Sequence, residues 1–350
     1  MLWDTVVIGA GQAGLSAGYW LKSMSGQENF LILDRHSGAG EVWHQRYESL
    51  RLFTPRSHSS LPGLHLAGDP KGFPDKNEIS LYLQQYAEHF QLPIRFNTEV
   101  TSVRKEQGVF IIDSKQETFQ ARRLIIATGP FQHPSVPAFS QVVPKDILQL
   151  HSSLYKEPSQ LQEGNVLVVG GGNSGAQIAV ELSSVKLTYL ATSQTPKYVP
   201  LTIGDRSFFW WLDQLGILKA SSSSWVGKLL RSQGDPIFGY ELKEAVRYGK
   251  VILKKRVVNV THSGVHFQDG SVESVRNIIW ATGFYSSYEW LHIEGATDSL
   301  GQVLHSQGVS PVKGLYFAGL PWQTHRGSAL LTGVGQDTRR MVQAMNEKRN

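Results

Sequence analysis

Three glycines near the N-terminus, Gly9, Gly11 and Gly14, have the spacing of a loop that binds the pyrophosphate of a dinucleotide. They follow a β-rich run at residues 3–8 and precede a helical pattern. In such a loop Gly9 allows a tight turn, Gly11 lets the backbone approach the pyrophosphate, and Gly14 lets the helix pack closely on the strand. The N-terminus of that helix offers free N–H groups and a positive dipole end to the phosphates.

An acidic residue follows at the place where such a unit holds a ribose. Asp34 comes directly after the next apolar run, residues 30–33, about 20 residues beyond the last glycine. Its carboxylate can accept hydrogen bonds from ribose hydroxyls and disfavours a 2′-phosphate, which suits the adenosine of FAD. Besides the glycines, we therefore expect the first dinucleotide to contact Gln12, Ala13, Asp34 and Arg35.

A second loop repeats this design after the apolar run 166–169. It comprises Gly170, Gly172, Asn173, Ser174 and Gly175. The strand that follows runs into Thr192 and Ser193, with neither an acid to repel a 2′-phosphate nor an arginine to grip one. We expect these two residues to lie beside the ribose, and the loop to bind NADH and NADPH with little discrimination.

Two such units in one chain have a chemical logic, because a flavin can store the electrons that a nicotinamide delivers as hydride. Each loop is followed later by a strand that ends in Ala-Thr-Gly, at Ala127, Thr128 and Gly129 and again at residues 281–283. We expect the first three of these residues to contact the first dinucleotide. The same order of signals therefore occurs twice, which indicates a duplicated architecture. Between them, spacings of three and four predict an amphipathic helix over residues 77–90, followed by a short antiparallel meander.

These patterns predict an α/β fold with two Rossmann-like, three-layer dinucleotide-binding domains, the second inserted into the first. We expect residues 1–160 and 284–350 to form the FAD-binding domain and residues 161–283 the NAD(P)H-binding domain. The length of 350 residues agrees with two domains. Gly283 closes the second domain and is expected to contact its dinucleotide.

The composition excludes several classes of protein. Lys and Arg total 34 against 29 Asp and Glu, without a dense basic block, so nucleic acid is not an expected partner. The chain has no cysteine, which excludes disulfides, thiolate metal sites and a dithiol relay, and we expect no metal. No apolar run approaches the roughly 20 residues of a membrane span. Because a strand begins almost at Met1, no signal peptide is expected, and the expected location is cytoplasmic.

Taken together, the motifs resemble those of the flavin-containing monooxygenase group, over essentially the whole chain, and especially those of short bacterial members labelled CzcO-like or cation-efflux-associated. They are the two glycine-rich loops, Gly-Glu-Val-Trp ending at Trp43, the two Ala-Thr-Gly strand ends and His-Ser-Ser-Leu-Tyr from His151. The resemblance implies FAD on the first loop with Asp34 at its ribose. It further implies Val100 near the adenine, Trp43 near the flavin, Gly319 at the ribityl end and Asn173 on the nicotinamide side.

The sequence departs from the monooxygenase pattern at three places, one of which is the missing arginine beside the second loop, which family members usually use to grip NADPH. Of the fingerprint Phe-x-Gly-x-x-x-His only His151 is present, because Lys145 and Ile147 stand at the other two positions. Phe53 occupies the position where family monooxygenases often carry an asparagine beside the flavin. An asparagine amide can hydrogen-bond oxygen held at the flavin, whereas a phenyl ring cannot. The residues therefore support nucleotide binding better than oxygen insertion.

Other residues have more than one interpretation. Ser152 could cap a short helix in the linker after His151. The aromatic run 208–211 could line a substrate tunnel, touch a membrane, pack in the core or form a dimer contact. Asn173 and Arg326 are the candidate catalytic residues. An arginine near the flavin could stabilise the reduced form of the flavin, although Arg326 could equally be a surface residue.

Three functions remain open. The first is an NAD(P)H-dependent FAD monooxygenase that uses molecular oxygen on a small organic substrate. The second is an NAD(P)H:acceptor oxidoreductase without oxygen insertion. The third, suggested by the resemblance alone, is an accessory protein of a cation transporter. A thioredoxin-reductase function lacks its Cys-x-x-Cys pair, and a membrane-bound quinone reductase lacks an amphipathic C-terminal helix because residues 341–350 are too short and polar.

Overall fold

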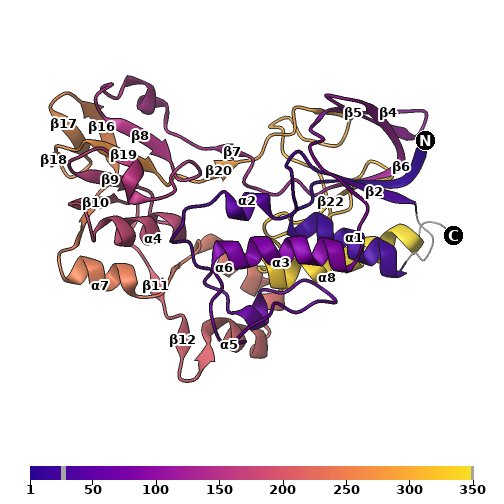
Figure 1. The fold of residues 1–350 in the computed structure, drawn as a ribbon, viewed down its shortest axis with the longest axis horizontal. Helices are drawn as coiled ribbons and strands as arrows, with labels where there is room; N and C mark the ends of the chain where they lie inside the picture. The colour runs from indigo at the N-terminus through magenta and orange to yellow at the C-terminus, as the bar shows by residue number, and fades with distance from the viewer. Residues whose placement is uncertain (25–28, 348–350) are drawn as a thin grey trace.

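The computed structural model, which describes residues 1–24 and 29–347, is organised around two sheets joined by a two-stranded connection (Figure 1). The first sheet has the strand order β21-β4-β5-β6-β1-β2-β3, with β22 also pairing with β6. Strands β2, β1, β6 and β22 run parallel, whereas β4, β5 and β6 form the predicted antiparallel meander. The bounds are β1 (Leu2–Ile8), β2 (Phe30–Leu33), β3 (Ile94–Arg95), β4 (Val100–Glu106), β5 (Val109–Ser114), β6 (Thr118–Ile126), β21 (Leu291–His292) and β22 (Leu315–Phe317).

Both faces of the first sheet are covered. Val7 and Ile32 point into a core shared with the helices, while Val6 and Leu33 point into a second core with the meander. Strands buried on both faces read as continuous apolar runs, which is why residues 30–33 carry no polar residue. The helices of this half are α1 (Gln12–Met24), α2 (Glu41–His44), α3 (Lys76–His89) and α8 (Leu331–Glu347).

The predicted amphipathic helix is confirmed as α3. Asp75 caps it, accepting hydrogen bonds from the backbone N–H groups of residues 77 and 78, while Glu78 accepts from the N–H of Asp75. This reciprocal capping box starts the helix one residue earlier than the apolar spacing predicts. Tyr82 and Tyr86 on its inner face are buried, and α1 packs against both α3 and α8.

The second sheet is entirely parallel, with the strand order β15-β10-β9-β19-β8. Its strands are β8 (Leu148–His151), β9 (Val166–Val169), β10 (Thr188–Ala191), β15 (Val251–Lys254) and β19 (Asn277–Trp280). Helices α4 (Asn173–Leu182) and α7 (Glu241–Arg247) pack on the sheet, and a meander of β16 (Val257–Thr261), β17 (Gly264–Phe267) and β18 (Val272–Glu273) packs against it through a separate core. The fold is therefore α/β with two three-layer units, as the sequence predicts.

Two short strands connect the halves, β7 (His133–Pro134) running antiparallel to β20 (Phe284–Tyr285) (Figure 1). The prediction that Ser152 caps a helix is wrong, since a turn follows β8 there. Instead, His151 Nε2 lies 2.9 Å from the carbonyl oxygen of Gly283 and Nδ1 accepts from the N–H of Ser153, so the imidazole ties the end of β8 to the second Ala-Thr-Gly turn.

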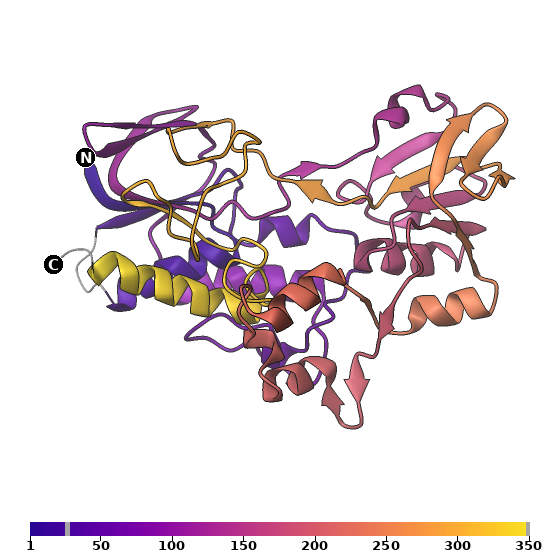
Figure 2. The ribbon, with the colours of Figure 1, turned by 180° about the vertical axis from the view of Figure 1, so that it is seen from behind.

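Residues 192–240 form an excursion from the second half toward the first. From behind, it lies beside the N-terminal end of α8 (Figure 2). There the N–H of Ser222 donates to the carbonyl of Thr324. The excursion contains β11 (Tyr198–Val199), β12 (Thr202–Ile203), β13 (Arg206–Ser207), α5 (Phe208–Gln214), α6 (Trp225–Ser232) and β14 (Ile237–Phe238). In the part of the chain that the structure describes, no helix combines the length and the apolar character needed to cross a bilayer.

Candidate dinucleotide sites

The two glycine-rich loops have the same construction at the carboxyl ends of β1 and β9. Gly9 and Gly170 adopt φ angles of +108° and +124°, which favour glycine. Each also lies against the first residue of an Ala-Thr-Gly turn, so an added Cβ would meet the carbonyl of Ala127 or of Ala281. Each alanine donates its own N–H to the strand beside it, Ala127 to Ile8 and Ala281 to Val169, both at 2.8 Å.

The helices after both loops begin with bare N-termini. The first turns of α1 and α4 carry no acidic residue, and no side chain caps α4 at Gly172. An added Cβ at Gly14 or Gly175 would overlap the backbone of its own loop. Glycine at these positions therefore lets each helix pack closely on the loop before it. At Gly11 and Gly172, in contrast, an added Cβ would meet no atom within 4 Å. The open space and the unpaired N–H groups fit an approaching pyrophosphate at both loops.

Asp34 is held against the first loop. Its carboxylate accepts hydrogen bonds from the N–H of Ala10 at 2.5 Å and of His36 at 2.8 Å. Burial would raise the pKa of Asp34, but the hydrogen bonds from His36 and Ala10 outweigh it and keep that pKa below its ordinary value. Asp34 is therefore an anion beside the loop and can still accept from a ribose. Arg35 is exposed next to it.

The other residues predicted to contact the first dinucleotide lie in the same half of the molecule. The N–H of Thr98 donates to the carbonyl of Asp34, and Val100 begins β4 two residues later. Gly319 has a φ of +78°, and an added Cβ would lie 2.7 Å from Ala13, so this turn rests on the start of α1. Trp43 in α2 is half-buried against the core of the same half. Thr128 and Gly129, in the first Ala-Thr-Gly turn, both accept hydrogen bonds from the amide of Gln132.

At the second loop, Thr192 is 9% exposed and Ser193 is exposed at the end of β10. Ser174 lies in the first turn of α4, and Gly283 has an open left-handed turn with a φ of +84°. Asp34, Ala127 and Gly319 thus lie against the first loop or the start of its helix, and Thr192 and the second Ala-Thr-Gly turn lie against the second loop. Arg326 belongs to neither set by direct contact: its guanidinium lies 3.8 Å from Asp235 of the excursion.

Asn173 has a structural connection that the sequence does not indicate. Its Nδ2 donates to the carbonyl of Pro236 at 3.1 Å, and its Oδ1 accepts from the N–H of Phe238 at 2.9 Å. Phe238 in turn stacks on Phe53, with ring centroids 4.4 Å apart and an interplanar angle of 13°. An apolar cluster that also includes Phe209 and Leu330 continues toward the start of α8.

This aromatic cluster, defined by Phe53, Phe209, Phe238 and Leu330, lies between the two loops. At one end Asn173 of α4 holds β14. At the other, the carbonyl of Ala329 accepts from the side chain of Gln12 at the start of α1, 2.6 Å away. Phe53, whose side chain contains only carbon and hydrogen, stacks on both Phe209 and Phe238 within this cluster.

Two buried polar contacts were not predicted from the sequence. Lys76 is 1% exposed, and its Nζ donates to Glu48 at 2.9 Å and to the carbonyl of His44 at 2.8 Å. His325 and Asp337 are both buried, with Nε2 and Oδ1 3.6 Å apart. Burial lowers the pKa of His325, although Asp337 opposes that shift. No periodic or motif signal marks any of these side chains as buried.

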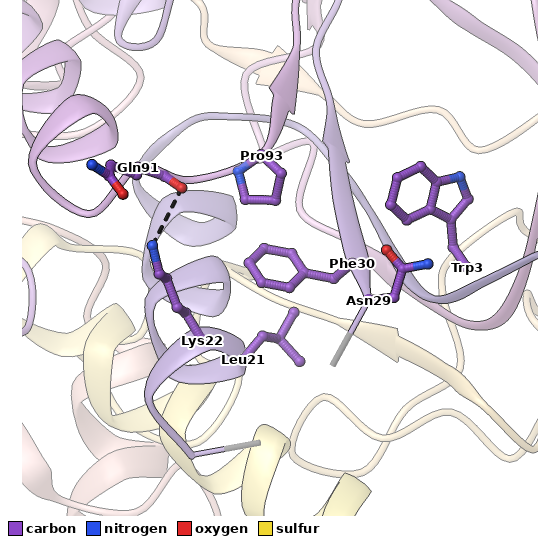
Figure 3. A pocket seen from close by; sticks show the side chains of 7 residues that line it. All are labelled: Trp3, Leu21, Lys22, Asn29, Phe30, Gln91 and Pro93. Atoms are coloured by element: carbon purple, nitrogen blue, oxygen red, sulfur yellow. Dashed lines mark hydrogen bonds between the residues drawn. The ribbon is translucent and has the colours of Figure 1, made fainter. Parts of the chain in front are cut away.

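A depression lined by Trp3, Leu21, Lys22, Asn29, Phe30, Gln91 and Pro93 opens elsewhere (Figure 3). It lies at the amino ends of β1 and β2, where the Nζ of Lys22 donates to the carbonyl of Phe90 at 2.8 Å. Dinucleotides bind at the carboxyl ends of parallel strands, so this depression is separate from the two sites.

The two strand–loop–helix units, each at the carboxyl ends of parallel strands, define the class of protein as an α/β protein with two dinucleotide-binding units. The chain belongs to the pyridine nucleotide-disulphide oxidoreductase family, whose model matches residues 6–196. A Bacillus subtilis (strain 168) protein named uncharacterized oxidoreductase CzcO is 54% identical over 99% of both chains.

Solved structures agree with this assignment. The flavin-containing monooxygenase from Stenotrophomonas maltophilia superposes with a TM-score of 0.81 at 27% identity, covering 100% of this chain and 99% of that one. DfoA bound to FAD, a cadaverine monooxygenase from Erwinia amylovora, superposes with a TM-score of 0.77 over 99% of this chain and 95% of its own. At 18% identity the second likeness concerns the fold alone.

Proposed function

We propose that this oxidoreductase binds FAD at the first loop and NADH or NADPH at the second, and acts as a monooxygenase-type enzyme on a small organic substrate. The observation that carries the proposal is the open space at Gly11 and Gly172, each in front of a bare helix N-terminus. The similarity to the Stenotrophomonas flavin-containing monooxygenase over both full chains supports the reaction class. The carboxylate of Asp34 beside the first loop, which suits the ribose of an adenosine without a 2′-phosphate, supports FAD as the first cofactor.

When bound, the flavin supplies the electron transfer and oxygen chemistry. The chain's own residues bind and orient. The N–H groups at the starts of α1 and α4 hold the two pyrophosphates, and Asp34 orients the adenosine ribose of the first dinucleotide. The aromatic cluster around Phe53 and Phe238 excludes water from the region between them.

The division of the chain remains part of the proposal. We assign FAD binding to residues 1–160 and 284–350 and nicotinamide binding to residues 161–283. Because β8 pairs with β19 in the second sheet, the segment from Leu148 to His151 supports the nicotinamide half structurally.

A second candidate function, an NAD(P)H:acceptor oxidoreductase without oxygen insertion, is favoured by one observation. Phe53 stacks on Phe238 and has no group that could hydrogen-bond oxygen held at a flavin. Such an enzyme would return electrons to a soluble acceptor or release hydrogen peroxide.

Rapid mixing of the anaerobically reduced, FAD-loaded protein with oxygen distinguishes the two functions. With NADP⁺ or NAD⁺ bound, a monooxygenase gives a long-lived absorbing species between reduced and oxidised flavin. Direct return to oxidised flavin, with stoichiometric peroxide, selects the acceptor oxidoreductase. If the wild-type protein returns directly to oxidised flavin, Phe53→Asn should delay that return and let the absorbing species be detected. Phe209→Leu, in the same aromatic cluster, is the matched control.

A further inference from the structure

Arg46 lies between two aromatic rings. Its guanidinium carbon lies 5.4 Å from the ring centroid of Phe131 and 5.2 Å from that of Phe284. Within residues 1–24 and 29–347, its side chain forms no hydrogen bond or ion pair. The residue is half-buried, and burial lowers its pKa. Two aromatic faces offset only part of the cost of removing such a charge from water, which leaves the guanidinium available to bind an anion.

The segment that carries Arg46 is held firmly in place. The buried Nζ of Lys76 donates to the carbonyl of His44, and the Nζ of Lys156 donates to the carbonyl of Gln45. These bonds anchor the backbone before Arg46, and the rings of Phe131 and Phe284 flank its guanidinium, so the group is positioned before any ligand arrives.

The same segment contacts α4, the helix that follows the second dinucleotide loop. Tyr47 is 2% exposed, and its hydroxyl donates to the side chain of Gln177 in α4 at 2.8 Å. Burial raises the pKa of Tyr47 to about 12, so the hydroxyl keeps its proton. Phe284, one of the two rings that flank Arg46, directly follows Gly283 of the second Ala-Thr-Gly turn. Arg46 therefore lies where the first half meets α4 and its loop.

We propose that Arg46 binds the pyrophosphate of the nicotinamide dinucleotide, together with the N-terminus of α4. The inference rests on the proposed function of the second loop. A guanidinium presents five N–H donors in a planar fork that matches phosphate oxygens, whereas helix N–H groups reach only one side of the diphosphate. Since NADH and NADPH share this diphosphate, Arg46 contributes equally to both and does not select between them.

The test uses FAD-loaded protein and three variants. Arg46→Met removes the donors, Arg46→Lys keeps the charge without the fork, and Arg51→Met, an exposed arginine on the same segment, is the control. Dissociation constants are measured calorimetrically for NADH, NADPH and ADP-ribose, which retains the diphosphate without nicotinamide. We expect Arg46→Met to raise all three by the same factor, at least about tenfold. Arg46→Lys should give a smaller rise, with FAD content and the Arg51→Met values unchanged.

Unchanged dissociation constants in both Arg46 variants would overturn the inference while leaving the proposed function intact. A rise for NADPH alone would also overturn it, because it would place Arg46 at the 2′-phosphate. If the wild-type protein binds none of the three ligands, the proposed function fails first and the inference falls with it. Circular dichroism and thermal midpoints of the variants exclude misfolding, and Arg46→Lys provides the result if Arg46→Met is unstable.

Discussion

Replacing Gly172 with alanine separates ligand binding from folding at the second loop. Gly172 has φ −84° and ψ 178°, which any residue adopts, and an added Cβ meets no atom within 4 Å. Alanine gains about 0.4–1 kcal/mol by restricting the unfolded chain. It loses a similar amount, about 0.5–1 kcal/mol, as a poorer N-cap than glycine. The free energy of unfolding without ligand should therefore change by less than about 1 kcal/mol.

Ligand binding should respond strongly to the same change. The added methyl group would occupy the space through which the diphosphate approaches the N–H groups of α4. Losing one hydrogen bond to a charged group costs about 1.5–3 kcal/mol. At 1.4 kcal/mol per factor of ten, the dissociation constant for NADH or NADPH should rise about 10- to 150-fold.

Gly175→Ala is the contrasting variant, because its Cβ would overlap the backbone of Gly170. It should destabilise the protein itself, by about 1–3 kcal/mol or more. The assays are urea unfolding of each variant and calorimetric titration of the FAD-loaded protein. Wild-type nicotinamide affinity in Gly172→Ala would refute the placement of the diphosphate, and so would a loss of stability equal to that of Gly175→Ala.

Three further predictions concern other parts of the sites. Asp34→Ala should weaken FAD binding at least about tenfold, measured by flavin fluorescence during dialysis, because a charge-assisted acceptor is lost; undiminished flavin retention would contradict the ribose role. Ser193→Arg should shift the affinity ratio toward NADPH about tenfold or more by adding a partner for the 2′-phosphate, and an unchanged ratio would place the adenosine ribose elsewhere. Burial lowers the pKa of His58, His151 and His305, so these residues take up protons more readily once unfolded, and stability should be lost as pH falls through the unfolded value of about 6.5. Urea unfolding between about pH 7.5 and pH 5.5 tests this, with each such proton contributing up to about 1.4 kcal/mol per pH unit; His151→Gln, whose amide can still donate to Gly283, should reduce the slope.

Both loops could be predicted from the sequence because their determinants are local. The turn, the close approach and the helix start at Gly9, Gly11 and Gly14 lie within one β-α-β unit, as does Asp34. The repeat at Gly170 is equally local. The Ala-Thr-Gly turns were also predicted, but their role as the surfaces behind Gly9 and Gly170 depends on strand order, which only the structure supplies.

The surroundings of the loops could not be predicted, because they depend on contacts between distant segments. Tyr47 and Gln177 are 130 positions apart, and Asn173 reaches Pro236 across 63. A lysine at the first position of a helix is expected to be exposed to solvent. Lys76 is buried because its ammonium group donates to His44 and Glu48 of another segment. The wrong prediction of a helix cap at Ser152 has a local origin instead, because serine suits a turn as well as a cap.

The direct test of two facing dinucleotide sites is anaerobic mixing of the purified protein with NADH or NADPH while the oxidised flavin spectrum is recorded. We predict that the protein binds FAD, that either nicotinamide bleaches the flavin completely, and that Gly172→Ala slows the bleaching at low nicotinamide concentration. A colourless protein that takes up no added FAD would contradict the account, and so would a bound flavin that neither nicotinamide reduces.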